Sequence, residues 1–209
     1  MLLYYITDRR QFPGSEGERT ARLLYRIAEA AAAGVDFIQL REKDLPTKDL
    51  ESLAHAALER VRSSERNTRL LINSRADVAL AVGADGVHLR SCDMFPEQVR
   101  RIWRWAGANN DPIISVSCHT EPEIAAAEAN GADFAVFAPV FAKKDVPATA
   151  ATGLDKLHSA CRHKIPVLAL GGVNAKNAYS CVDAGATGIA GIRLFQEGNL
   201  EDTLKTLRR

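Results

Sequence analysis

The stretch Ala33-Gly34-Val35-Asp36-Phe37-Ile38-Gln39-Leu40-Arg41-Glu42-Lys43 contains the two features from which the fold and the site are predicted. Its first half places a glycine, which stops a helix, two residues before an aspartate that leads into a strand. The same pattern recurs at residues 82–86 and 130–134 and, with threonine in place of aspartate, at 184–188. The repeat comes about every fifty residues, which is twice the length of one compact strand-helix unit. Eight such units in 209 residues predict a minimal parallel (β/α)₈ barrel, a TIM barrel.

Hydrophobic spacing and turn residues divide the whole chain into these units. We expect strands at residues 2–6, from 37 onward, and at 70–72, 86–89, 112–116, 134–137, 166–170 and 188–192. We expect helices at about 18–33, from 47 onward, and at 76–82, 95–106, 121–130, 153–162, 175–184 and 200–207. No stretch reads as a linker, so residues 1–209 are predicted to form a single domain. A doubly wound open sheet is the alternative, although its usual GxGxxG pattern after the first strand is absent.

The second half of the opening stretch carries an amide and two cations at alternate positions. Side chains on a strand alternate between its faces, so Gln39, Arg41 and Lys43 are predicted to share one face. Because unpaired buried charge is costly, this face is interpreted as an anion site. In the alternative interpretation, Arg41 and Lys43 pair with Glu42, Asp44 or another carboxylate at the rim of the sheet.

Composition excludes several classes of function. The 27 Lys and Arg residues nearly cancel the 26 Asp and Glu residues, which argues against a general nucleic-acid or membrane-surface binder. Apolar runs are short, and we expect neither a signal peptide nor a membrane span. The cysteines are far apart and form no zinc pattern, which favours reduced thiols in a cytoplasm. They are Cys92, Cys118, Cys161 and Cys181.

In a barrel of this kind the site lies where the strands end, and the residues at those ends are rich in cations and amides. Phosphate is therefore the predicted class of ligand. Gly171 and Gly172 after the seventh strand, and Gly191 after the eighth, would let the backbone approach a phosphate closely. Arg193 either pairs with the same phosphate or reaches out to solvent.

Seven short segments resemble thiamine phosphate synthases and their TenI-type relatives. They occur in the same order across almost the whole chain and are more specific together than any one alone. The segments are Gln39-Leu40-Arg41-Glu42-Lys43, Ile72-Asn73, Ala84-Asp85-Gly86-Val87-His88-Leu89, Ser115-Val116-Ser117-Cys118-His119-Thr120, Gly131-Ala132-Asp133, Ala138-Pro139-Val140-Phe141 and Leu170-Gly171-Gly172-Val173. On this resemblance the chain is identified as a member of that family.

The resemblance implies a transferase of thiamine biosynthesis. Such enzymes join hydroxymethylpyrimidine diphosphate to a thiazole phosphate carboxylate with Mg²⁺, giving thiamine phosphate, pyrophosphate and CO₂. The protein mainly neutralises the leaving group and positions the reactants. The residues predicted to be catalytic are Arg41, Lys43 and Ser117. The residues predicted to bind the small phosphorylated substrates are Gln39, Arg41, Lys43, Asn73, Ser117, Lys143, Lys144, Gly171, Gly172 and Gly191. The resemblance leaves a homo-oligomer open.

The metal-binding segments depart from the family pattern. Family synthases carry Asn-Asp after the third strand, where the Asp binds Mg²⁺, whereas here Ser74 follows Asn73. Asp93 is the remaining metal carboxylate, and we expect it to hold Mg²⁺ together with the substrate diphosphate. A helix N-cap is the alternative role for Asp93. Arg90-Ser91 replaces the usual Gly-Gln and adds a cation near the site, and Ala142-Lys143-Lys144 replaces a Thr-x-Thr of the thiazole phosphate clamp.

Three alternative functions follow from these departures. A TenI-type thiazole tautomerase would need an acid-base histidine where this chain has Pro139; His119 is a substitute base or else caps or packs beside the fifth helix. A catalytically silent paralogue that binds thiazole or thiamine phosphate is favoured by Ser74. A general phosphate-sugar barrel would share the glycine pair but explains the Gln-Arg-Lys pattern less well.

Overall fold

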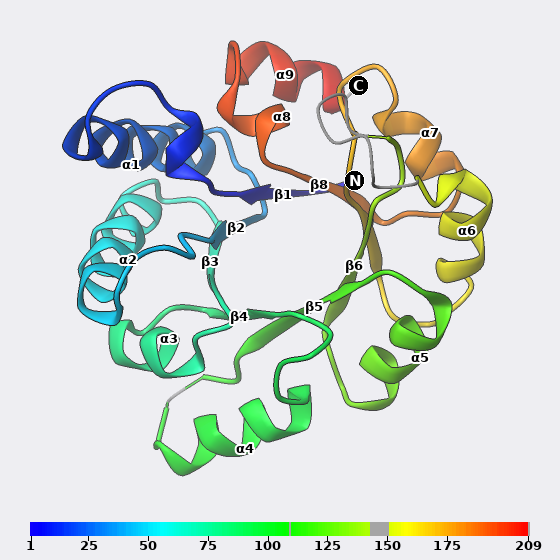
Figure 1. The fold of residues 1–209 in the computed structure, drawn as a ribbon, viewed down its shortest axis with the longest axis horizontal. Coiled ribbons are helices and arrows are strands. Elements are labelled where there is room, and N and C mark those ends of the chain that lie inside the picture. The colour runs from blue at the N-terminus through cyan, green and yellow to red at the C-terminus, as the bar shows by residue number, and fades with distance from the viewer. Residues whose placement is uncertain (109, 143–150, 209) are drawn as a thin grey trace.

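Eight parallel strands form a closed barrel in the computed structural model, which describes residues 1–108, 110–142 and 151–208. Each strand pairs with the next along the chain, and β8 closes the ring by pairing with β1 through Leu2 and Gly188 (Figure 1). The strands are β1 (Leu2–Ile6), β2 (Phe37–Leu40), β3 (Arg69–Asn73), β4 (Gly86–Leu89), β5 (Ile113–Cys118), β6 (Phe134–Phe137), β7 (Val167–Ala169) and β8 (Gly188–Gly191). The predicted parallel (β/α)₈ barrel is therefore confirmed.

Helices surround this ring and connect successive strands (Figure 1). They are α1 (Glu16–Ala32), α2 (Thr47–Arg62), α3 (Ala76–Val82), α4 (Pro96–Trp105), α5 (Glu121–Ala129), α6 (Gly153–Ala160), α7 (Ala178–Asp183), α8 (Arg193–Gln196) and α9 (Leu200–Leu207). A capping box formed by Thr120 and Glu123 opens α5, and Ser15 with Glu18 forms another at α1. Within the described ranges, no helix is long and apolar enough to cross a membrane.

The repeated glycine-aspartate pattern has a physical explanation in the barrel. The glycines that stop α1, α3 and α5 have positive φ values of 77°, 69° and 76°, which suit glycine at a helix end. Each following aspartate accepts a hydrogen bond from a backbone N–H of the preceding strand. The bonds are Leu3 N to Asp36 at 2.8 Å, Leu70 N to Asp85 at 2.8 Å and Ile114 N to Asp133 at 2.7 Å. The pattern thus marks alternate strands, which accounts for its double-unit spacing.

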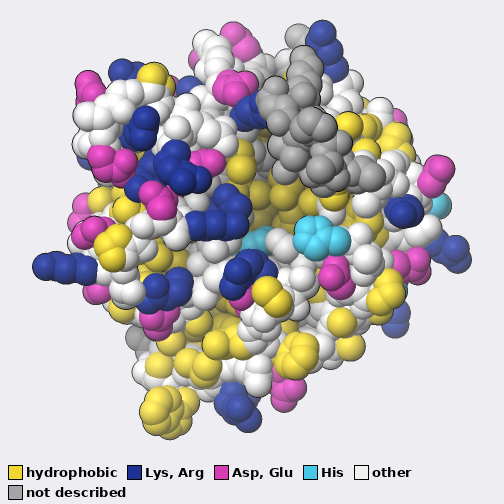
Figure 2. Space-filling view, in the orientation of Figure 1, with side chains coloured by type: hydrophobic (Ala, Val, Ile, Leu, Met, Phe, Trp, Pro, Cys, Tyr) yellow, Lys and Arg dark blue, Asp and Glu magenta, His cyan; other side chains and the backbone are white. Residues whose placement is uncertain are grey.

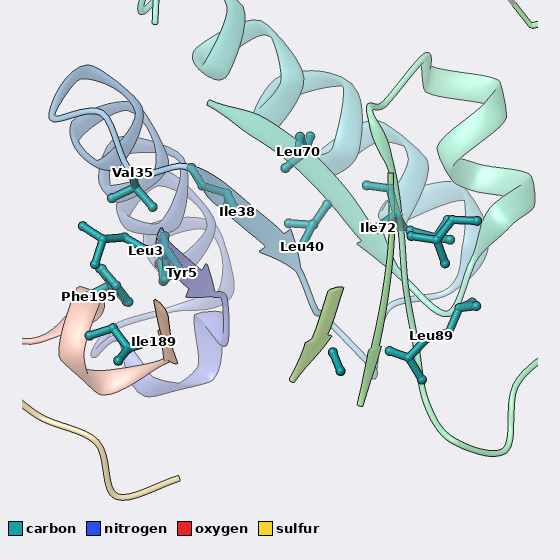
Figure 3. Close-up of a cluster of buried hydrophobic side chains, with 14 of the residues drawn as sticks. Leu3, Tyr5, Val35, Ile38, Leu40, Leu70, Ile72, Leu89, Ile189 and Phe195 are labelled. Carbon is teal, nitrogen blue, oxygen red and sulfur yellow. The ribbon is translucent and has the colours of Figure 1, made fainter. Parts of the chain in front are cut away.

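The apolar core has two parts, one on each side of the strands. Inside the barrel, Tyr4, Phe37 and Phe134 pack edge to face or tilted near the amino-terminal ends of the strands. The second part lies between the strands and the helices, where Ile38 and Leu40 project away from the barrel axis (Figure 3). Because side chains alternate along a strand, Gln39 faces the barrel interior together with Phe37.

Several strand ends differ from the sequence-based expectation, and two of them, the ends of β2 and β5, affect predicted site residues. Strand β2 ends at Leu40, so Arg41 and Lys43 lie in the following loop and are not part of the strand that carries Gln39. The predicted single strand face bearing all three residues was therefore wrong, because the chain leaves the sheet before the second residue. Strand β5 runs two residues further than predicted and brings Ser117 into the sheet.

Close packing between neighbouring strands makes Gly86 a position where a side chain would clash. A Cβ atom there would lie 1.9 Å from the Ile113 carbonyl oxygen, whereas one at Gly17 in α1 would meet nothing within 4 Å. We expect Gly86→Ala to lower the free energy of unfolding by at least about 3 kcal/mol, since backbone must move to admit the methyl group. The control Gly17→Ala should be neutral or stabilising by up to about 1 kcal/mol. Urea unfolding of both variants measures the contrast, and equal effects would contradict this reading of the strand pair.

Candidate active site

A layer of polar side chains lies inside the barrel at the carboxyl ends of the strands. Gln39 from β2 is buried, and its Nε2 donates a hydrogen bond to Asn73 Oδ1 of β3 at 2.9 Å. The other amide atom, Gln39 Oε1, is buried without a hydrogen-bond partner among the described residues. A buried acceptor without a partner is costly, so this atom suits a ligand that brings a donor.

His88 of β4 connects this layer to Ser117 of β5. Its Nδ1 lies 2.8 Å from Ser115 Oγ and its Nε2 lies 2.7 Å from Ser117 Oγ. Burial, followed by the positive charge of Arg41, lowers the pKa of His88 to about 3, so the ring is neutral near pH 7. His88 is therefore a fully hydrogen-bonded interior residue, and it fixes the hydroxyl of Ser117.

The acidic residues next to the Arg-Lys pair are bound to another arginine. Arg9 in the short 3₁₀ helix Arg9–Gln11 is buried, and its Nη1 contacts Glu42 Oε2 at 3.1 Å and Asp44 Oδ1 at 2.8 Å. Thr7 Oγ1 also donates to Glu42 Oε1. Burial raises the pKa of Glu42, although Thr7 and Arg9 oppose this rise by hydrogen bonding to its carboxylate. Glu42 and Asp44 are thus occupied by Arg9, and the alternative that they pair with Arg41 or Lys43 was wrong.

Arg41 and Lys43 consequently lie at the barrel mouth and form no ion pair in the described part of the chain, although the charge of Asp8 acts on Lys43. Arg41 is held through its backbone N–H, which donates to Thr7 Oγ1 at 2.9 Å. Burial and then the positive charges of Arg41 and Arg90 lower the pKa of Lys43. Figure 2 shows Lys and Arg side chains bordering the central hollow on the side of β2, β3 and β4. This cationic edge can bind a polyanion.

Asp93, the predicted metal ligand, is already engaged by two neighbours. Its Oδ1 accepts from Arg90 Nη2 at 2.8 Å, and its Oδ2 accepts from Ser74 Oγ at 2.6 Å and from Arg90 N at 2.8 Å. Despite partial burial, these bonds hold the pKa of Asp93 below its usual value. The N-cap alternative was wrong, because Phe95 occupies the N-cap of α4.

These residues do not fit a protein-held Mg²⁺. The second carboxylate is replaced by Ser74, and both oxygens of Asp93 accept hydrogen bonds from Ser74 or Arg90. Across the described residues, no group of three or more His, Cys, Asp or Glu side chains is arranged to hold a metal ion. The dependence on Mg²⁺ stays a prediction, with no support from this donor set.

The predicted glycine positions lie on the opposite side of the mouth. Gly171 and Gly172 have φ values of 94° and 66°, and a Cβ on either would come within 2.7 Å of Pro139 or Phe141. Their lack of side chains therefore lets the β6 and β7 loops meet. The N–H groups of Gly172 and Val173 have no hydrogen-bond partner in the described part of the chain. Gly191 ends β8. The predicted Lys143 and Lys144 lie outside the described residues.

The two residues relevant to tautomerase chemistry also lie at this mouth. Pro139 offers no group that can transfer a proton. His119 directs its Nδ1 to the Ala138 carbonyl oxygen at 2.8 Å, and its backbone N–H donates to Glu123 of α5. His119 thus packs across the ends of β5 and β6, beside the fifth helix.

Comparison with known proteins agrees with this geometry. The family model described as thiamine monophosphate synthase matches residues 3–195. This chain belongs to the thiamine monophosphate synthase family. A putative thiamine-phosphate synthase of Geobacter sulfurreducens is 44% identical over 193 residues, covering 90% of this chain and 83% of the relative. A putative thiamine-phosphate synthase 2 of Aquifex aeolicus is 38% identical and covers 93% of this chain and 97% of the relative.

Solved structures support the same family. Thiamine phosphate pyrophosphorylase from Pyrococcus furiosus matches with a TM-score of 0.81 at 31% identity, covering 99% of this chain and 93% of that chain. A 3-hexulose-6-phosphate synthase matches with a TM-score of 0.69 at 19% identity, covering 100% of this chain and 98% of that chain, and shares the fold. Membership of the thiamine monophosphate synthase family, expected from the seven segments, is thus confirmed.

Sequence reasoning missed two arrangements that shape the site of this family member. The sequence contained no local signal that Arg9 would bind Glu42, which lies 33 positions away. The bond between His88 and Ser117 joins different strands, and only the register of β4 with β5 brings their side chains together. The pairing of Arg90 with Asp93 had a detectable signal, since Asp93 lies three positions after Arg90 and the family pattern has no arginine there.

The neighbouring residues Arg9 and Arg10 provide a matched test of the buried ion pair. Arg9→Met leaves the buried Glu42 carboxylate without its cation, so we expect it to lower the free energy of unfolding by about 3–5 kcal/mol. Arg10 is exposed and lies 3.9 Å from Asp8. Arg10→Met should therefore change stability by less than about 0.5 kcal/mol. Chemical unfolding at pH 7 measures both, and a mild effect of Arg9→Met would refute the importance of the pair.

The lowered pKa of His88 predicts a pH-dependent stability. Below its ordinary value of 6.5 the unfolded chain binds a proton at His88 that the folded protein does not bind until about pH 3. The free energy of unfolding therefore falls as the pH decreases through this window, by about 2 kcal/mol between pH 7 and pH 5 from this residue. His88→Gln should lose that component, while the exposed His55→Gln keeps it. Urea unfolding at both pH values tests this; an unchanged pH dependence in His88→Gln would show the prediction to be wrong.

Proposed function

We propose that this chain is a transferase that joins hydroxymethylpyrimidine diphosphate to a thiazole phosphate carboxylate, forming thiamine phosphate. Its membership of the thiamine monophosphate synthase family supports this reaction. The observation that carries the proposal is the cationic edge at the carboxyl ends of the strands, where Arg41 and Lys43 form no ion pair in the described ranges. A diphosphate would supply the missing negative charge.

The reaction requires a leaving group to depart and a nucleophile to be in position. The bond between the pyrimidine methylene carbon and the diphosphate oxygen breaks, and its electron pair leaves with pyrophosphate. The thiazole nitrogen uses its lone pair to form the new C–N bond, and loss of CO₂ returns an electron pair to the thiazole ring. In this proposal Arg41 and Lys43 stabilise the charge that develops on the leaving pyrophosphate.

The polar layer inside the barrel is suited to hold the pyrimidine. Gln39 Oε1 is a buried acceptor without a partner among the described residues, and the amino group of the pyrimidine is a donor. Asn73 fixes the Gln39 amide from the next strand. Ser117, oriented by the neutral His88, is proposed to contact the pyrophosphate or the pyrimidine beside it. Holding both reactants in this way lowers the barrier by orientation.

The thiazole phosphate is proposed to bind across the mouth from the pyrimidine. The N–H groups of Gly172 and Val173, which have no partner in the described part of the chain, can donate to phosphate oxygens. Gly171 lets the β6 and β7 loops meet beside these N–H groups, and Gly191 leaves room for the Leu194 side chain after β8. Lys143 and Lys144 are proposed to add charge to the same phosphate.

The other functions are less well supported. A tautomerase of the TenI type lacks its acid-base residue, because proline at position 139 cannot exchange a proton. A silent binding paralogue would conserve phosphate binding without turnover and is distinguished by the assay below. Self-association of the chain and its location in a cytoplasm stay predictions.

Replacement of Arg41 tests the cationic edge. We expect Arg41→Ala to lower the rate of thiamine phosphate and pyrophosphate formation by at least about 100-fold, since it removes a charge-assisted contact to the leaving group. The melting temperature should change by only a few degrees, since the Arg41 side chain forms no ion pair within the described ranges. Arg60→Ala, at an exposed position late in α2, is the matched control and should retain full activity.

The same product assay, together with a titration with thiamine phosphate, decides between catalysis and silent binding. Product from the wild-type chain, lost in Arg41→Ala, supports the transferase. Binding of thiamine phosphate by wild-type protein that forms no product would instead establish a binding paralogue.

A further inference from the structure

The arrangement of Ser74, Arg90 and Asp93 gives this site a cation of its own. Arg90 donates to Asp93 Oδ1 through both Nε at 3.1 Å and Nη2 at 2.8 Å, a two-point contact that orients the planar guanidinium. Its backbone N–H and the Ser74 hydroxyl bind the other carboxylate oxygen. The carboxylate therefore positions an arginine, and its oxygens are not left open for a metal.

Arg90 remains able to bind a second anion. Its side chain is 56% exposed, whereas that of Asp93 is 11% exposed. Its Nη1 has no hydrogen-bond partner among the described residues. A guanidinium has five N–H donors, so donors remain for phosphate after both contacts to Asp93 are made.

The serine at position 74 is the second departure from a metal-binding site. Ser74 has a φ of 57°, in the left-handed region that Asp and Asn tolerate better than most side chains. A carboxylate here would stand against Asp93 and would require a cation between them. The serine hydroxyl instead donates to Asp93. With one acid removed, the single charge of Arg90 balances the single charge of Asp93, and no divalent ion is required for neutrality.

Arg90 also lies beside the predicted leaving-group site. It follows β4, and Arg41 and Lys43 follow β2, on either side of β3 in the closed sheet. The positive charges of Arg41 and Arg90 both lower the pKa of Lys43, beside the geometry of the sheet. Arg90 thus extends the cationic edge that Arg41 and Lys43 form.

We propose that Arg90 binds the substrate diphosphate in place of a divalent metal ion, so that this chain binds pyrophosphate without Mg²⁺. The inference rests on the proposed transferase function and assigns Arg90 as a further substrate-binding residue. Asp93 is a positioning residue for the guanidinium. Because residue 74 is a serine, the site has no second carboxylate and needs no metal ion to balance one.

Calorimetric titration with inorganic pyrophosphate tests this without relying on turnover. Titrations are run in excess EDTA and in Mg²⁺ sufficient to complex all pyrophosphate, so that each titrant is a single species. Wild-type protein should bind metal-free pyrophosphate at least as tightly as the Mg²⁺ complex. Arg90→Gln should weaken metal-free binding by about 10- to 100-fold, the worth of a charge-assisted contact. Arg101→Gln, at an exposed position in α4, is the matched control and should bind as wild type does.

The reciprocal variant tests the exchange of cation for metal. In Ser74→Asp combined with Arg90→Gly, two carboxylates replace the arginine pair, so pyrophosphate binding should become dependent on Mg²⁺ by at least about tenfold. Circular dichroism and melting temperature establish that each variant is folded. Should Arg90→Gln not fold, the double variant and the wild-type comparison in EDTA still test the proposal.

Each outcome supports or overturns the inference. It is overturned if wild-type protein binds pyrophosphate only with Mg²⁺, if it binds in neither condition, or if Arg90→Gln binds as tightly as wild type. Metal-free binding that depends on Arg90, without formation of thiamine phosphate, would support this inference while removing the proposed transferase. Product formation that strictly requires Mg²⁺ would do the reverse.

Discussion

The buried ion pair between Arg9 and Glu42 decides which charges remain available at the barrel mouth. Arg9 forms ion pairs with Glu42 and Asp44, the two acidic residues that alternate with Arg41 and Lys43 after β2. Because a buried carboxylate requires a cation, this pairing is enforced by desolvation rather than by sequence proximity. Arg41 and Lys43 are consequently left facing the mouth, where a diphosphate can neutralise them. The site depends on a contact that lies outside it.

The side chains inside the barrel differ between its two ends. Aromatic side chains fill the amino-terminal half of the interior, whereas amide, imidazole and hydroxyl groups occupy the carboxyl-terminal half. His88 joins Ser115 and Ser117 and stays neutral because its ring is buried, so it adds no charge to a site that already has several cations. A protonated ring at this place would repel Arg41, which, after burial, is the second cause of the lowered pKa of His88.

Much of the fold could be predicted from short-range patterns. The glycine-aspartate repeat indicates where helices stop and strands begin, and the barrel shows its cause, since Asp36, Asp85 and Asp133 each bind the backbone of the preceding strand. The point at which β2 ends could not be predicted in this way. Alternation continues through Lys43 in the sequence, but Arg41 is held by Thr7 of the adjacent segment, and this contact is tertiary.

The sequence by itself determined the barrel, the family and the residue types at the strand ends, because helix stops, strand periodicity and ordered motifs are local properties of the chain. It also contained the substitution at position 74 and the arginine at position 90. The tertiary structure decided how these charges pair. Arg9 binds Glu42, 33 positions away, and Ser74 binds Asp93, 19 positions away. Both contacts form because neighbouring strands end at the same rim of the barrel. Electrostatic pairing depends on distance in space and on burial, and only the closed barrel defines both.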